Sequence, residues 1–155
     1  MKEGLRQFLQ KANKEGYGSG KTDHWVKEKD GSTTIPFVSG DFRMHDNFFG
    51  GEPYGGREVI FFKGAAVWMM VYYGKVNAGE HFAKLYKFLQ KALLNAPDEM
   101  PVRGPKFLED EEFKYTNEWE GNMDEFNGEE SVSKNGETVY NASYRGGLVD
   151  QRKEN

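Results

Sequence analysis

The sequence predicts an α+β domain in which two copies of an α-β-β-β unit build a curved antiparallel sheet of about six strands, with two helices packed on one side. Three observations support this fold class. The pentapeptide Phe-Leu-Gln-Lys-Ala occurs twice, at residues 8–12 and 88–92. Each copy belongs to an apolar stripe of helical period and is followed by segments typical of strands. Matching residues then follow in the same order in both halves, which indicates an internal repeat.

The first half begins with a predicted helix around residues 5–12, where apolar side chains recur at intervals of three and four. The glycine-rich segment 16–20 ends this helix. The polar stretch 21–34 follows, and it contains an insertion that the second half lacks. Short glycine-containing turns then separate three predicted strands, which cover residues 41–49, 57–62 and 66–73.

The second half repeats this order with a predicted helix over residues 80–94, which Pro97 prevents from continuing. Strands are predicted over residues 113–119, 129–134 and 138–144. Asn135-Gly136 is typical of a two-residue type I′ hairpin turn, because both central positions of that turn need positive φ.

The two halves are expected to form one domain over residues 1–149, with repeats at about 5–76 and 82–149. The polar residues 150–155 are predicted to be a disordered tail, since they offer no apolar anchor. The alternative architecture is a pair of smaller sheets packed as a half-barrel.

Glu58 and Glu130 occupy matched positions in the two copies and are the first candidates for a site. If Asn135-Gly136 is a two-residue turn, Val132 pairs with Val139, and this pairing fixes which side chains share a face with each glutamate. A turn one residue longer would exchange the two faces. The faces that carry the glutamates supply the candidate ligand-binding residues Glu58, Met69, Tyr73, Glu130 and Asn141.

A carboxylate placed among apolar strand residues is costly to bury unless it is paired. Burial also raises the pKa of a carboxyl group, so such a group could act as an acid or base. The simpler interpretation is a structural glutamate at the start of a strand, hydrogen-bonded to a neighbouring loop. The many aromatic residues on the strands are expected mainly in the core, with a minority lining a pocket.

Composition excludes several functional classes. The 155-residue chain contains no cysteine, so thiolate metal sites and thiol nucleophiles are excluded. Its net charge is −4 and basic residues are not clustered, so neither nucleic acid nor a membrane surface is an expected partner. The three histidines lack metal-ligand spacing, and neither a metal nor a cofactor is expected. The glycine-rich segment 16–20 follows a helix rather than a strand, which argues against a phosphate loop.

Several motifs together resemble an uncharacterised prokaryotic domain family. They are Phe8–Ala12 with Tyr17–Gly20, Gly40–Phe42 with Phe49–Gly51, the block Gly56–Gly74, Arg103-Gly104-Pro105, and Tyr144–Leu148. Members of that family occur alone or C-terminal to helix-turn-helix regulators of the Xre/Cro type. The resemblance therefore implies association with transcriptional regulation, and it offers no catalytic residues to transfer. The helix-turn-helix part is not in this sequence, so DNA binding by this chain is not implied.

Two functional hypotheses follow. The first is a cytoplasmic, non-catalytic module that senses a small molecule or binds a protein. The second is a small hydrolase or isomerase that uses a partly buried glutamate as acid or base. A deep pocket that holds either glutamate beside a second polar group would favour the enzyme, whereas a shallow apolar patch would favour protein interaction.

Overall fold

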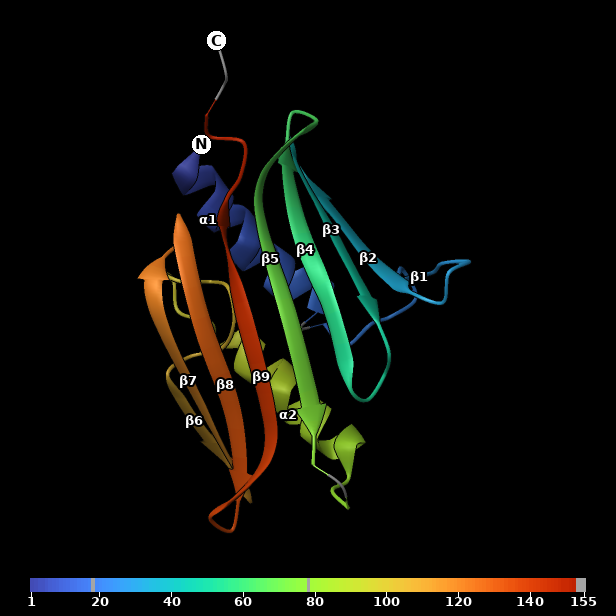
Figure 1. Cartoon of the computed structure of the whole chain (residues 1–155), viewed down its shortest axis with the longest axis vertical. Helices are drawn as coiled ribbons and strands as arrows, with labels where there is room; N and C mark the ends of the chain where they lie inside the picture. The colour runs from blue at the N-terminus through green and yellow to red at the C-terminus, as the bar shows by residue number, and fades with distance from the viewer. Residues whose placement is uncertain (18, 78, 153–155) are drawn as a thin grey trace.

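The computed structural model of the chain describes residues 1–17, 19–77 and 79–152. Within these residues, nine strands form one antiparallel sheet in the order β1-β2-β3-β4-β5-β9-β8-β7-β6, accompanied by two α-helices and a π-helical turn (Figure 1). The first half consists of α1 (Lys2–Ala12), η1 (Asn13–Tyr17), β1 (Val26–Lys27), β2 (Thr33–Ser39), β3 (Phe42–Phe49), β4 (Tyr54–Phe62) and β5 (Ala65–Val76). The second half consists of α2 (Phe82–Leu94), β6 (Phe107–Asp110), β7 (Phe113–Asn122), β8 (Glu125–Lys134) and β9 (Glu137–Leu148).

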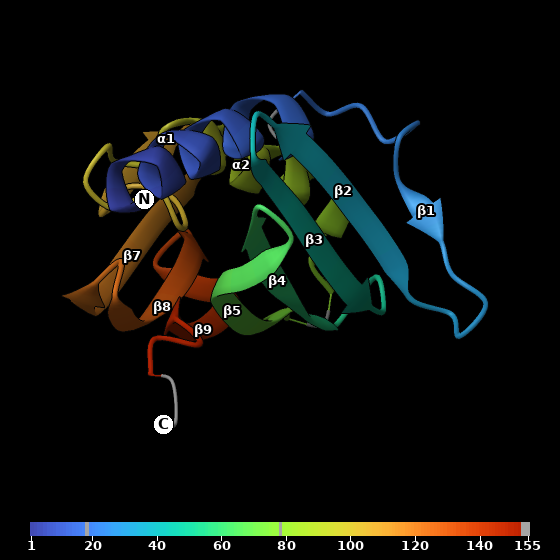
Figure 2. The ribbon, with the colours of Figure 1, turned by 90° about the horizontal axis from the view of Figure 1, so that it is seen from above.

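The sheet curves strongly, and both helices lie across its concave side (Figure 2). The concave face and the helices enclose the apolar core, in which Phe8 of α1 and Phe88 of α2 are both buried. Phe8 stacks on Phe42 with ring centroids 5.4 Å apart, and Phe88 stacks on Phe113 at the same separation. Each helix thus buries one apolar stripe against the strands that follow it in the chain.

The expected α+β fold with about six strands is wrong, because the described residues form nine strands and only two short helices of 11 and 13 residues. The chain is therefore a sheet-dominated fold. The alternative half-barrel of two sheets is also wrong, since all nine strands belong to one sheet.

The missed strands carry weak local signals. β1 has two residues and β6 has four, which is shorter than a recognisable alternating pattern. β2 contains Pro36, which cannot donate a ladder hydrogen bond and argues against a central strand. The structure accommodates Pro36 because β1 covers only Thr33 and Thr34 of β2, so the outer side of β2 is a free edge at the proline.

In each half a helix precedes a run of antiparallel strands, five in the first half and four in the second, and β5 pairs with β9 at the junction of the halves. Tyr72 of β5 lies directly opposite Tyr144 of β9 in that pairing. Duplication of an ancestral unit stays a prediction. Residues 153–155 of the expected disordered tail lie outside the described residues.

Within residues 1–17, 19–77 and 79–152, no helix is long and apolar enough to cross a membrane.

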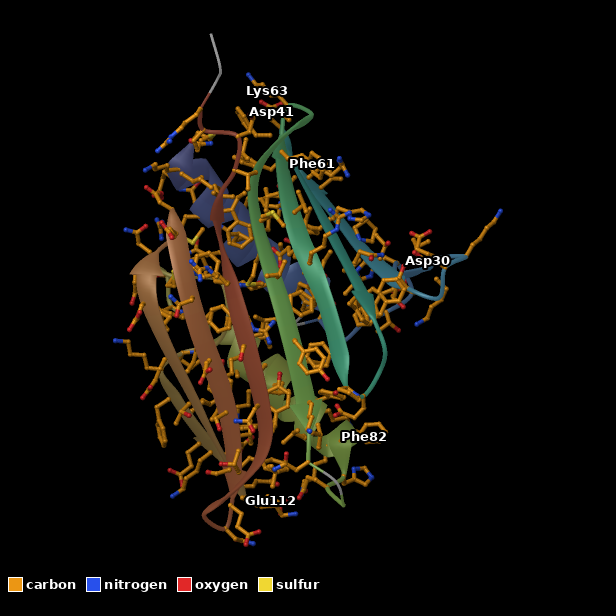
Figure 3. All side chains as sticks on the ribbon, viewed as in Figure 1. Asp30, Asp41, Phe61, Lys63, Phe82 and Glu112 are labelled. Atoms are coloured by element: carbon orange, nitrogen blue, oxygen red, sulfur yellow. The ribbon has the colours of Figure 1, made fainter. Side chains whose placement is uncertain are left out.

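The β4–β5 turn of the first half and the β6–β7 turn of the second half lie at opposite ends of the molecule (Figure 3). Lys63 of the β4–β5 turn forms an ion pair with Asp41 at 3.8 Å at one end, whereas Glu112 of the β6–β7 turn lies at the other end (Figure 3). Asn135 and Gly136 form the expected two-residue turn, with φ values of 52° and 80° and with Lys134 opposite Glu137.

The pairing expected beyond this turn is wrong, because Val132 lies opposite Tyr140 rather than Val139. A β-bulge shifts the register between Val132 and Ser133, and a second bulge shifts it between Ile60 and Phe61 in the first half. A bulge inserts one extra residue on one strand, so every later side chain of that strand changes face.

Replacing Gly136 with valine is expected to destabilise the protein by roughly 1 kcal/mol or more, because a β-branched residue is strained at positive φ. A Cβ atom at Gly136 would meet nothing within 4 Å, so the cost is conformational rather than steric. Gly51→Val is the matched control, since Gly51 also has open space and its φ is not in the left-handed region. Chemical denaturation of both variants measures the difference, and equal stabilities would contradict the turn geometry.

Candidate functional site

A cavity of about 420 Å³ lies between the concave face of the sheet and the helices. Strands β3, β4, β5 and β8 supply its polar floor, η1 and α2 supply its roof, and the loop that follows α2 closes one side. The polar and aromatic residues that line it include Tyr17, Trp25, Lys27, Asp46, Phe48, Tyr54, Glu58, Tyr72, Tyr86, Arg103 and Glu130.

Two acidic side chains lie next to each other on the cavity floor. Asp46 of β3 and Glu58 of β4 are directly opposite in the antiparallel register, and both are buried. The hydroxyl of Tyr72 donates a hydrogen bond to Asp46, whereas the Glu58 carboxyl has no hydrogen-bond partner among the residues that the structure describes. Side chains opposite each other on neighbouring strands have Cβ atoms about 4.5–5.5 Å apart, so the two carboxyl groups interact directly.

Burial changes the protonation of this acid pair. Loss of hydration raises the pKa of Asp46 to about 7, against the lowering effects of the Tyr72 hydrogen bond and the Arg103 charge. Loss of hydration and the neighbouring Asp46 charge raise the pKa of Glu58 to about 8, with Arg103 again acting in the opposite direction. Near neutral pH the pair therefore holds at least one proton, and it can both donate and accept one.

A buried ion pair stands beside the two acids. Arg103 directs its Nε toward Oε1 of Glu130 at 2.8 Å and also contacts that oxygen through Nη2. Tyr115 donates its hydroxyl proton to the other oxygen of Glu130 at 2.5 Å. Burial alone would lower the pKa of Arg103, but the adjacent Glu130 outweighs this effect and holds the pKa above its ordinary value. Arg103 is thus a fixed cation whose charge Glu130 neutralises.

Hydrogen bonds to η1 and β7 fix the loop that carries Arg103. Asn13 of η1 donates its Nδ2 to the Pro101 carbonyl at 2.8 Å. Gly104 donates its N–H to the Tyr115 hydroxyl at 3.1 Å and accepts a hydrogen bond from Asn117 Nδ2 at 2.9 Å. A Cβ atom at Gly104 would come within 2.6 Å of the Tyr115 hydroxyl, so only glycine permits this close approach.

Aromatic side chains form the remaining walls and the rim. Trp25 meets Phe48 edge to face with ring centroids 5.9 Å apart, and Tyr54 hydrogen-bonds to Tyr140 across the sheet. The Tyr17 hydroxyl and the Trp25 Nε1 are buried without a hydrogen-bond partner among the described residues. Because a buried polar group without a partner is costly, these two donors are positioned to satisfy a bound molecule.

The structure brings only two of the five expected site residues into this cavity. Glu58 and Glu130 line it, whereas Tyr73 and Asn141 are exposed and Met69 contributes to a shallow depression on the other face of the sheet. The bulges explain why Met69, Tyr73 and Asn141 lie outside the cavity, because they move these three side chains to the sheet face opposite the glutamates.

Sequence reasoning missed Asp46, Tyr72 and Arg103 as members of the site. Asp46 can be recognised as a site residue only because it lies opposite Glu58 in the β3–β4 pairing, and no local sequence pattern predicts that pairing. The Arg103-Gly104-Pro105 motif was recognisable, and its chemical meaning depends on Glu130, 27 residues away in the chain. Within the described ranges, no group of three or more His, Asp or Glu residues could hold a metal ion.

The curved sheet, the two helices across it and the cavity with its polar floor define a sheet-dominated domain with a pocket between sheet and helices. The chain belongs to the DUF5680 family, described as a domain of unknown function, whose model matches residues 46–149. The match includes Asp46, Glu58, Arg103 and Glu130, while α1 and the rim residue Trp25 lie outside it. No curated protein and no solved structure shows significant similarity to the chain.

Proposed function

We propose that this chain is a ligand-sensing domain that binds a small molecule in the cavity between the sheet and the helices. The observation that carries the proposal is a cavity of about 420 Å³ with convergent polar groups on an aromatic lining. Ligand sites in proteins are typically concave, largely apolar and equipped with a few well-placed polar groups, with volumes of about 300–1,000 Å³. A protein-interaction surface is less well supported, because an interface does not require buried carboxyl groups in a cavity.

The resemblance to domains joined to helix-turn-helix regulators supports a sensing role rather than a catalytic one. In such a role, the bound molecule would stabilise the closed arrangement of helices and sheet, and a partner regulator would respond to that arrangement. Both η1 and α2 form part of the roof, so occupancy of the cavity would be transmitted to the helical side of the molecule.

Thermal-shift screening with a metabolite library tests the proposal. A ligand that binds only the native state raises its stability by about 3 kcal/mol at a concentration one hundred times its Kd, which is a shift of several degrees in a domain of this size. Leu89→Trp is expected to abolish these shifts, because Leu89 of α2 lines the cavity and a larger side chain would fill it.

Leu94→Trp is the matched control, since Leu94 is 43% exposed on the same helix and does not line the cavity. Glu58→Gln provides a second variant that changes the cavity without filling it. Absence of any stabilising compound, or shifts that persist unchanged in both cavity variants, would contradict ligand binding at this site.

Acid–base catalysis is the second candidate function, and the adjacent Asp46 and Glu58 carboxyl groups favour it. A deep pocket that holds a glutamate beside a second polar group is what an isomerase or hydrolase of this kind needs. Any compound found by the screen can be recovered from the protein and analysed by NMR. Conversion that is lost in Asp46→Asn or Glu58→Gln would indicate catalysis, and recovery of the unchanged compound would indicate sensing.

A further inference from the structure

The carboxyl groups in the cavity outnumber the cations available to them. Asp46, Glu58 and Glu130 converge from β3, β4 and β8, and the guanidinium of Arg103 is already bound to Glu130 through Nε and Nη2. Lys27 lies at the exposed rim on β1, where its Nζ donates to the Thr33 hydroxyl at 2.9 Å. Asp46 and Glu58 are therefore left without a counter-ion of their own.

Glu58 is the least satisfied of these acids. It is 5% exposed, it lines the cavity, and none of the described residues donates a hydrogen bond to its carboxyl oxygens. Buried carboxyl groups are normally paired or hydrogen-bonded, because an unpartnered one carries the full cost of lost hydration. A bound molecule that donates hydrogen bonds to Glu58 and Asp46 would remove this cost.

The surrounding walls suit a cation with an apolar body. Trp25, Phe48 and Tyr54 present aromatic faces or edges to the same cavity, and Leu89 and Leu93 of α2 add aliphatic surface. Aromatic faces attract ammonium and guanidinium groups, and an apolar body gains from burial against them. An anion would instead meet two unpaired acids and an arginine that is already neutralised.

We propose that the ligand of this site is an organic cation, a protonated amine on a compact apolar body, whose ammonium group is held between Asp46 and Glu58. This inference rests on the proposed ligand-binding function and names the chemical class of the ligand.

Binding of such a cation is coupled to proton release. Burial holds the pKa of both acids well above their ordinary range, so below neutral pH the pair is mostly protonated and must lose protons before it can bind an ammonium group. The other groups that face the pair are Tyr72 of β5, Tyr54 of β4, Glu130 of β8 and Arg103 of the loop. The pKa of each tyrosine is raised by burial, so both stay neutral, and affinity for the cation increases with pH.

Matched probes of different charge test this inference on the intact chain. Each set contains an amine, an alcohol and a carboxylate on the same body, for example 2-phenylethylamine, 2-phenylethanol and 3-phenylpropionate, with bodies that range from short alkyl chains to an indole. Isothermal titration calorimetry at about pH 6 and about pH 8.5, in two buffers of different ionisation enthalpy, gives the affinity and the number of protons released.

The amines are expected to bind at least about tenfold more tightly than their neutral and anionic counterparts, and about tenfold more tightly at the higher pH, with proton release. Glu58→Gln should remove most of this preference, and Glu129→Gln should keep it, because Glu129 is exposed on the opposite face of β8. Preferential binding of the alcohols or carboxylates would overturn the inference and leave the ligand-binding function intact. Absence of binding by every probe would overturn both.

Discussion

Replacing Arg103 with methionine is expected to lower the free energy of unfolding by about 3–5 kcal/mol, because it leaves the buried Glu130 carboxylate without its cation. Glu130 is 4% exposed, so water compensates only weakly for the lost partner. The effect extends to Asp46 and Glu58, since the Arg103 charge lowers the pKa of both. Urea denaturation near neutral pH measures the loss directly.

The double variant Arg103→Met/Glu130→Gln is expected to recover a large part of this stability. Removing both charges eliminates the unpaired buried ion, and a glutamine can still accept the hydrogen bond from Tyr115. Recovery would show that the cost comes from the orphaned carboxylate rather than from lost packing of the arginine side chain.

An exposed ion pair of the same chain supplies the control. Lys84 of α2 pairs with Glu112 at the β6–β7 turn, and its side chain is 53% exposed. Exposed ion pairs contribute about 0–1 kcal/mol, so Lys84→Met should have a small effect. If Arg103→Met costs no more than Lys84→Met, the buried cluster does not have the electrostatic role assigned to it.

The helices could be predicted from the sequence because their signal is local. The apolar stripe that includes Phe8 and the equivalent stripe that includes Phe88 are buried in the core, and the Asn135-Gly136 turn forms where expected. Six of the strand segments were also visible as apolar alternation. The strands that were missed, above all β2 with Pro36, are stabilised by neighbouring strands rather than by their own residues.

The site could be predicted only in part, because the sheet face on which a side chain lies depends on the register of the paired strands. Glu58 and Glu130 were found through their matched positions, but single-residue bulges after the hairpin turns placed Tyr73 and Asn141 on the opposite face. Asp46 and Arg103 join the glutamates through pairings between distant segments. Neither a bulge nor a long-range ion pair produces a recognisable pattern in a single sequence. The composition of the cavity could therefore be determined only from the structure.

The stability of the wild-type protein is expected to fall as the pH rises from about 5 to about 8, and Glu58 is expected to be a main cause. Burial and the Asp46 charge raise the pKa of Glu58 from an ordinary value of 4.5 to about 8. Between these two pH values the native state keeps a proton that the unfolded chain has already released, so each step upward in pH favours unfolding. The contribution is fully present below about pH 4.5 and is lost by about pH 8.

Glu58→Gln removes this titration, because an amide of the same shape has no proton to lose. A shift of this size corresponds to roughly 3–4 kcal/mol over the window, once interaction with Asp46 is allowed for. Glu58→Gln should therefore be close to the wild type in stability near pH 5 and more stable by roughly that amount near pH 8. Denaturant unfolding at several pH values measures the two curves.

Glu129→Gln serves as the control for the loss of one carboxyl group, because Glu129 is the exposed neighbour of Glu130 on β8. The free energy of unfolding of Glu129→Gln should change with pH in the same way as that of the wild type. Asp46 keeps its own raised pKa in Glu58→Gln, so some pH dependence should remain in that variant and should disappear in Asp46→Asn/Glu58→Gln. A wild-type protein whose stability is unchanged or increases between pH 5 and pH 8, relative to Glu58→Gln, would show that the acid pair is hydrated in solution. The cavity floor would then lack the proton-holding pair on which its chemistry depends.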